Sequence, residues 1–183
     1  MLTFEIPAYI SVDVETSGPT PGLYSLLSIG ACTISKPRKT FYAELIPISE
    51  SVEDRALARN HLSMEKLYQE GLPPSEVMQN FESWISSSIP ANIKPIMVAF
   101  NAPFDWMFIN DYFYRFIGHN PFGHSALDIK AFYMGARHTS WLQTSFQEVS
   151  HHYMEDRVLS HHALQDAIDQ AVLFQKVIGS TRV

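Results

Sequence analysis

Cysteine is nearly absent from the sequence, because Cys32 is the only one in 183 residues. A single cysteine excludes an intramolecular disulfide, and we expect a reducing, cytoplasmic location. The opening residues MLTFEIPAYI also lack a basic segment followed by a long apolar stretch, so we expect no signal peptide. No apolar run approaches the ~18 residues of a membrane-spanning helix, and we therefore expect no membrane partner.

Basic residues are scarce as well, with 13 lysines and arginines against 19 acidic residues and a formal net charge of −6. Domains that bind nucleic acids usually carry a basic excess, so the bulk charge argues against a large duplex-binding surface. The nearest basic cluster is formed by Lys36, Arg38 and Lys39. That cluster fits a solvated hairpin turn as well as a patch that follows a substrate strand, and both interpretations stay open.

The remaining composition is ordinary for a folded domain, with 46% hydrophobic and 17% charged residues, which argues against disorder. The length suits one well-buried domain, which we expect to span 1–183. The predicted strands are 8–18, 25–35, 40–48 and 94–100, and the predicted helices are 63–71, 73–89, 103–118, 125–136, 145–153 and one from about 161. Three strands, then helices that alternate with a further strand, indicate a mixed α/β fold.

The first strand carries two carboxylates at alternate positions. Along SVDVETSG, alternation places Val12 and Val14 on one face and Asp13 and Glu15 on the other. One interpretation is an edge strand with an acidic, solvent-facing side. The other is a site that binds divalent cations through oxygen ligands, because unpaired buried charges are costly and a metal supplies the opposite charge.

A third carboxylate, Asp105 in FNAPFDW, stands in the first turn of the predicted helix 103–118, directly after the strand 94–100. An acid at that place interacts favourably with the helix dipole, which requires no further function. The same place also suits a ligand site, because such sites gather at the carboxyl ends of strands in α/β proteins.

The last predicted helix opens with a pair of histidines in HHALQDAIDQ, which starts at His161. On a helical wheel, Asp166 shares an inward-facing line with Leu173, whereas Asp169 falls on a polar side. We therefore expect Asp166 to point into the protein and Asp169 to be solvated. Because His161 precedes the helix, its ring can swing over the position of Asp166.

The three motifs together are Asp-x-Glu in VDVETSG, Asp in FNAPFDW and His-x4-Asp in HHALQDA. In this order they resemble the motifs of the DEDDh 3′→5′ exonucleases, a group that includes DnaQ-like proofreading subunits, ribonuclease T and oligoribonuclease. The resemblance runs from Asp13 to Asp166. It implies a ribonuclease-H-like α/β fold with a central mixed sheet of about five strands flanked by helices, the fifth strand being implied by the family fold alone.

The resemblance also implies roles for five residues. Asp13, Glu15, Asp105 and Asp166 would bind two divalent cations, Mg²⁺ or Mn²⁺, and His161 would be the general base toward the attacking water. This chemistry is coherent, because two metals about 4 Å apart stabilise both the attacking and the leaving oxygen of an in-line displacement at phosphorus. An imidazole with a pKa near ~6.5 accepts a proton close to neutral pH.

The doubled histidine and the loop after the first motif need separate assignments. His162 lies where the tyrosine-type relatives carry their tyrosine, so we assign the base to His161. In relatives, residues just after the glutamate contact the 3′ end, and an aromatic ring beside the second-motif aspartate suits base stacking. The implied substrate-binding residues are Thr16, Ser17, Gly18 and Phe104. For the first three, a plain turn set by glycine and proline is an equally open interpretation.

The resemblance implies a metal-dependent 3′-5′ exonuclease that releases nucleoside 5′-monophosphates, and the acidic composition favours single-stranded or short nucleic acid as its substrate. Its partners would be 3′ ends of DNA or RNA, and a protein partner or a homodimer would also fit a proofreading role. One alternative is a catalytically silent domain of the same fold that binds a protein or nucleic acid. Another is a phosphohydrolase of small nucleotides. The presence of all five implied catalytic residues favours the exonuclease.

Overall fold

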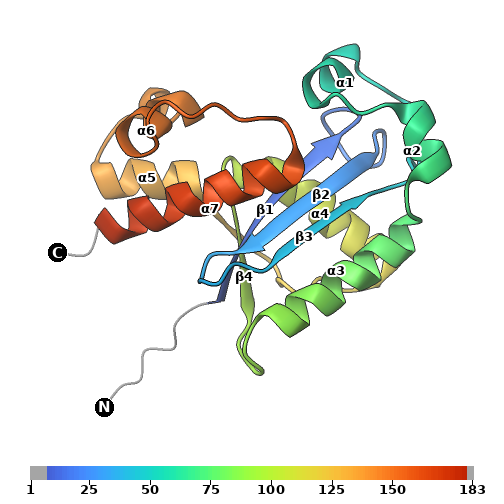
Figure 1. Cartoon of the computed structure of the whole chain (residues 1–183), viewed down its shortest axis with the longest axis horizontal. Helices are drawn as coiled ribbons and strands as arrows, with labels where there is room; N and C mark the ends of the chain where they lie inside the picture. The colour runs from blue at the N-terminus through green and yellow to red at the C-terminus, as the bar shows by residue number, and fades with distance from the viewer. Residues whose placement is uncertain (1–7, 181–183) are drawn as a thin grey trace.

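Five strands form one mixed sheet in the computed structural model, which describes residues 8–180 (Figure 1). The strands are β1 (Ala8–Thr16), β2 (Leu26–Thr33), β3 (Thr40–Glu44), β4 (Pro95–Ala99) and β5 (Ala126–Asp128). Their order is β3-β2-β1-β4-β5, with β1 antiparallel to β2 and parallel to β4. The predicted mixed sheet is thus confirmed. The first seven residues, which we expect to hold no signal peptide, and residues 181–183 lie outside the described range.

Helices cover both faces of this sheet (Figure 1). The helices of the described chain are α1 (Asp54–Asn60), α2 (Met64–Glu70), α3 (Pro74–Ser88), α4 (Ala102–Phe116), α5 (Ile129–Arg137), the 3-10 helix η1 (Trp141–Gln143), α6 (Phe146–Tyr153) and α7 (Ala163–Ser180). α3 and α4 pack on one face, and α5, α6 and α7 pack on the other. Within residues 8–180, no helix is long and apolar enough to cross a membrane.

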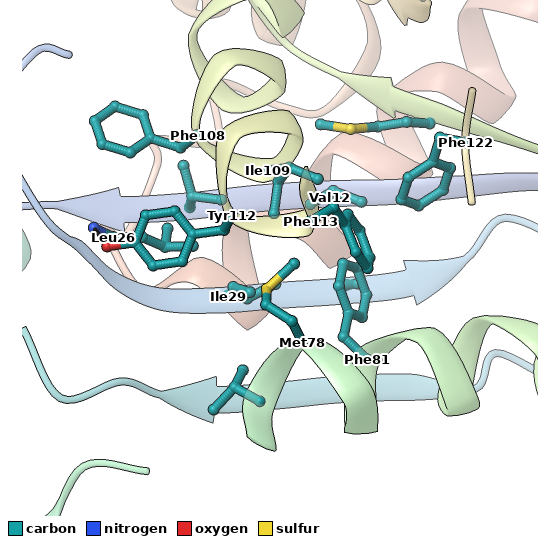
Figure 2. Close-up of a cluster of buried hydrophobic side chains, with 14 of the residues drawn as sticks. Val12, Leu26, Ile29, Met78, Phe81, Phe108, Ile109, Tyr112, Phe113 and Phe122 are labelled. Atoms are coloured by element: carbon teal, nitrogen blue, oxygen red, sulfur yellow. Dashed lines mark hydrogen bonds between the residues drawn. The ribbon is translucent and has the colours of Figure 1, made fainter. Parts of the chain in front are cut away.

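The larger core lies between the sheet and the pair α3 and α4 (Figure 2). Val12 of β1 and Leu26 of β2 are fully buried there, as their positions in apolar strands predict. The rings of Phe81 in α3 and Phe113 in α4 stack with centroids 5.7 Å apart. Tyr112 is buried as well, and its hydroxyl accepts a hydrogen bond of 2.9 Å from the backbone N–H of Leu26. Tyr112 and Phe113 of α4 therefore build the core.

On the opposite face, α7 crosses the sheet at very short range. Gly30 of β2 makes this possible, since a Cβ added there would lie 2.1 Å from the backbone of Ala163 at the start of α7. Gly30 is also the β2 partner of Asp13 across the β1–β2 ladder. The missing side chain therefore lets α7 lie directly against the carboxylate-bearing part of β1.

Three short elements depart from the prediction. Residues 125–136 were expected to form one helix, but β5 occupies their start before α5 begins at Ile129. Ala126, Leu127 and Asp128 form a strand because they pair with β4. Three residues are too few to show the alternation of apolar and polar residues that predicts a strand. The sequence also gave no prediction for α1 and η1, which are both too short to show a helical period.

Candidate active site

β1 holds the first two carboxylates at the centre of the sheet, because it lies between β2 and β4. The edge-strand interpretation of SVDVETSG is therefore wrong. Val12 and Val14 point into the core, while Asp13 and Glu15 are partly buried on the other face, as alternation predicts. The β1–β2 register shifts between Glu15 and Thr16, and such irregularities commonly re-aim side chains next to active sites.

Asp105 joins this end of the sheet from the first turn of α4. Its Oδ1 atom accepts a hydrogen bond of 3.1 Å from the backbone N–H of Val14, so the carboxylate lies beside the Asp13–Glu15 pair. The turn that delivers it contains Asn101 in the left-handed conformation, a state that asparagine tolerates better than most residues. Asp128 stabilises the turn, since its Oδ1 atom accepts hydrogen bonds from the N–H groups of Asn101 (2.9 Å) and Ala102 (3.2 Å).

Asp166 completes the set from the first turn of α7 and is only 2% exposed, as its inward position predicts. Its two carboxylate oxygens accept three hydrogen bonds, from the N–H (2.7 Å) and hydroxyl (2.8 Å) of Ser160 and from the N–H of His161 (2.8 Å). His161 has a left-handed backbone with φ of 56°. Such a conformation costs about 1–3 kcal/mol, and the contacts to Asp166 hold it in place.

The prediction for Asp169 is wrong. This residue is 4% exposed, and its Oδ2 atom lies 2.6 Å from Nε of Arg157. Its Oδ1 atom also accepts a hydrogen bond of 3.0 Å from Gln165. The reason is that the loop after α6, which leads to His161, folds back over the polar side of α7. A helical wheel marks that side as polar but does not show what covers it.

Gln170 of α7 contacts both the first motif and the second motif, and it was not among the predicted site residues. Its Nε2 atom donates to Oδ1 of Asp13 at 2.6 Å, and its Oε1 atom accepts from the N–H of Phe100 at 2.9 Å. The side chain is 1% exposed. Its position four residues after Asp166 was the available signal, because residues i and i+4 of a helix share one face.

These segments enclose one cavity of about 330 Å³. The residues that line it are Asp13, Val14, Glu15, Thr16, Ala56, Arg59, Asn60, Phe100, Asn101, Phe104, Asp105, Leu159, His161 and Asp166. Ligand atoms of Glu15, His161 and Asp166 lie within 4.8 Å of one another, close enough to share a metal ion. A larger cavity of about 730 Å³ lies at the other end of the sheet, and the described residues that line it include no carboxylate or histidine.

The structure separates the predicted substrate-binding residues into two groups. Thr16 and Phe104 line the cavity, whereas Ser17 and Gly18 do not. The hydroxyl of Ser17 donates to the carbonyl of Ser51 at 2.8 Å, and Gly18 packs under the ring of Tyr24. These two positions therefore build the turn that follows Glu15.

The two histidines are also separated. His161 lines the cavity, while the ring of His162 stacks on Tyr42 with centroids 4.7 Å apart. Partial burial lowers the pKa of His161, the charges of Arg59 and His61 act in the same direction, and Asp166 opposes them. The imidazole at the cavity is thus biased toward its neutral form, which has a free lone pair for a proton.

Three carboxyl groups of the cavity, those of Asp13, Glu15 and Asp105, have raised pKa values. Burial raises the pKa of Glu15 to about 8, with repulsion by Asp166 and Asp105 adding to it. Burial also raises the pKa of Asp105 to about 8, although the hydrogen bond from Val14 opposes the shift. The pKa of Asp13 is raised well above its ordinary value by burial and by the charges of Asp105 and Glu15. A divalent cation would relieve this repulsion.

A mixed sheet with four carboxylates and one imidazole at the end of its central strand is the arrangement that the resemblance to ribonuclease-H-like nucleases predicts. The family model of the Rv2179c-like 3′-5′ exoribonuclease domain matches residues 8–178. The chain is 47% identical to the 3′-5′ DNA exonuclease Cap18 of Escherichia coli, over 92% of this chain and 90% of that protein. The chain therefore belongs to the Rv2179c-like family of 3′-5′ exonucleases, and it is an exonuclease of the DEDDh type.

Solved structures show the same fold. The nuclease domain of 3′hExo, described as a DEDDh family member bound to rAMP, matches with a TM-score of 0.80 at 12% identity, covering 97% of this chain and 94% of that one. Exonuclease I of E. coli in complex with a dA16 oligonucleotide matches with a TM-score of 0.66 at 16% identity. This chain covers 41% of the length of exonuclease I.

Proposed function

We propose that the chain hydrolyses single-stranded or short nucleic acid from its 3′ end by a two-metal mechanism, releasing nucleoside 5′-monophosphates. One observation carries the proposal: Asp13, Glu15, Asp105, Asp166 and His161 come from three distant segments and line a single cavity. Acids that repel one another and bury their charge reduce stability, so a role in ligand binding accounts for them better than a structural role.

The donor set fits Mg²⁺ or Mn²⁺, since both ions prefer carboxylate oxygens together with water and substrate phosphate. Asp13, Glu15, Asp105 and Asp166 would hold the two ions. When bound, such ions stabilise the attacking and leaving oxygens at the phosphorus. The hydrogen bonds to Asp13 from Gln170 and to Asp105 from Val14 orient these carboxylates before any ligand arrives.

His161 would take a proton from the attacking water on a ring nitrogen. Its lowered pKa keeps the ring neutral at neutral pH, and its place at the cavity wall lets it reach a water above the carboxylates. Replacement by glutamine should keep the cavity but remove the base, which typically lowers kcat by about 10²–10⁴-fold. The acidic limb of the pH–rate profile should fall below the ordinary histidine pKa of ~6.5 and disappear in His161→Gln.

The volume of the cavity also limits the size of the substrate that can enter it. Its volume of about 330 Å³ is near the lower end of small-molecule sites, which suits one terminal nucleotide rather than a duplex end. Thr16 and Phe104 would contact that nucleotide, with the Phe104 ring against the base. The 47% identical relative is named for DNA, whereas the family description names RNA. We propose single-stranded DNA as the preferred substrate, because that relative is matched over 90% of its length.

A gel assay tests the function. Two 5′-labelled strands of about 12 nucleotides with matched sequence, one DNA and one RNA, would be incubated with Mg²⁺, Mn²⁺ or EDTA. We expect a ladder that shortens from the 3′ end, is faster on DNA, and is lost with EDTA and in Asp13→Ala. A ladder that persists in EDTA would overturn the metal mechanism, and a faster ladder on RNA would overturn the choice of sugar.

A further inference from the structure

Arg59 is the only lysine or arginine among the described residues that line the active-site cavity. It lies in the last turn of α1, and its side chain is exposed at the rim, whereas Asp105 and Asp166 are buried at the floor. An acidic cavity must admit a polyanionic strand, so a cation at its rim calls for an explanation.

α1 is fastened to the segment that follows Glu15, which fixes where Arg59 stands. The side-chain amide of Asn60 donates to the carbonyl of Thr16 at 3.2 Å, and Asn60 is only 6% exposed. At the other end of the helix, the N–H of Glu53 donates to the carbonyl of Ser17 at 2.8 Å. A solvated surface arginine would not require its helix to be tied to the first motif at both ends.

The guanidinium of Arg59 acts on the site without being neutralised there. Its charge lowers the pKa of Glu15 and that of His161, so it stands within electrostatic reach of both. In the part of the chain that the structure describes, Arg59 nevertheless forms no ion pair. Its planar donors thus stay available for an anion, and guanidinium groups bind phosphate oxygens in a bidentate manner.

We propose that Arg59 is a substrate-positioning residue that binds the phosphate next to the scissile one on its 5′ side. This inference rests on the proposed function. The scissile phosphate would lie over the carboxylates at the cavity floor, so the rim position of Arg59 places it against the strand that leaves the cavity. The same contact would give a chain with a formal net charge of −6 one cation that faces the phosphate backbone.

The test compares two substrates. A DNA strand of about 12 nucleotides carries the upstream phosphate, whereas p-nitrophenyl thymidine 5′-phosphate has only the phosphate that is hydrolysed. In Arg59→Ala we expect KM for the oligonucleotide to rise about tenfold with kcat within about twofold, and hydrolysis of the small substrate to be unchanged. The slope of log(kcat/KM) against log salt should fall by about 0.7, the value for one lost phosphate contact on a single strand.

Arg55 provides a matched control, because it lies on the same helix, is exposed, and does not line the cavity. Arg55→Ala should behave as wild type. Arg59→Lys should keep the salt slope of wild type, but its KM should lie between those of wild type and Arg59→Ala, because lysine lacks the bidentate guanidinium group. An Arg59→Ala variant indistinguishable from Arg55→Ala would overturn the proposal. Equal losses of kcat/KM on both substrates would show that Arg59 does not bind the phosphate on the 5′ side of the scissile one. Failure of the proposed function itself would look different, since wild type would then leave both substrates intact.

Discussion

At the scale of single residues, the site depends on polar side chains that hold the carboxylates as well as on the carboxylates themselves. Asp13 receives its side-chain hydrogen bond from Gln170, which also accepts from the N–H of Phe100. One glutamine therefore connects β1, the turn before α4, and α7. Outer partners of this kind fix the orientation of metal-binding groups, and their loss typically lowers activity by about 10- to 100-fold.

Gln170→Leu should lower the free energy of unfolding by about 1–3 kcal/mol, because the N–H of Phe100 loses its buried partner. It should also lower kcat by at least roughly tenfold, because Asp13 loses its orienting bond. Gln175→Leu is the matched control, since Gln175 lies on the same helix and donates to the carbonyl of Ile34 at 2.7 Å, away from the cavity. Equal kcat values for the two variants would contradict the positioning role, and denaturant unfolding would check that both fold.

The raised pKa values of the carboxyl groups predict how stability depends on pH. In the metal-free protein, burial holds the pKa of Glu15 and of Asp105 at about 8, above their values in an unfolded chain. The folded state therefore binds more protons than the unfolded state, so this contribution to stability is full at low pH and is lost as the pH rises through about 8.

We accordingly expect the Tm in EDTA to fall between about pH 5 and about pH 8.5, and Mg²⁺ or Mn²⁺ to raise the Tm more at the higher pH. Differential scanning fluorimetry across this range measures both effects. Glu15→Gln, which cannot ionise, should flatten the fall in EDTA. A metal-induced rise in Tm that is the same at both ends of the range would show that the ions bind without displacing these protons.

At the scale of elements, the decisive contact is between α7 and β2. Because a Cβ on Gly30 would lie 2.1 Å from the backbone of Ala163, any side chain there must push the start of α7 away. That movement would carry Asp166 and His161 away from Asp13. Short-range packing of backbone on backbone thus sets the distance between the first and third motifs.

Gly30→Ala should lower the free energy of unfolding by about 1–3 kcal/mol, the usual cost of overpacking, and should lower kcat more than stability alone explains. Gly135→Ala is the control, since Gly135 lies in α5 with open space around it. That variant should be neutral or slightly stabilising, because alanine is the better helix former by up to about 1 kcal/mol. Thermal unfolding and the ladder assay together check the pair, and full activity in Gly30→Ala would refute the account of this contact.

At the scale of the whole molecule, the sequence predicted the parts of the site that depend on local pattern. Alternation along the strand predicted the face on which Asp13 lies, and the helical wheel predicted that Asp166 points into the protein. Both predictions succeed because the two periods are set by backbone geometry alone. The covering of Asp169 by Arg157 and the strand β5 were not predictable in this way, since both depend on segments brought together by folding. Arg59 was missed for a related reason: α1 is too short for its period to be seen.

The order of the three motifs along the chain carried the family resemblance, and the fold confirms it, because segments as distant as β1 and α7 meet at the end of one strand. Neither the local sequence pattern nor the order of the motifs predicts where metal ions bind. We propose that Asp13, Glu15, Asp105 and Asp166 hold two divalent cations beside His161.

The most direct measurement is anomalous X-ray diffraction from crystals of the wild-type protein grown with Mn²⁺ and thymidine 5′-monophosphate. We expect two anomalous peaks roughly 4 Å apart, coordinated by the four carboxylates and the nucleotide phosphate, with His161 facing the space beside them. A nucleotide bound elsewhere, or crystals saturated with Mn²⁺ that show no peak among the four carboxylates, would contradict the proposal.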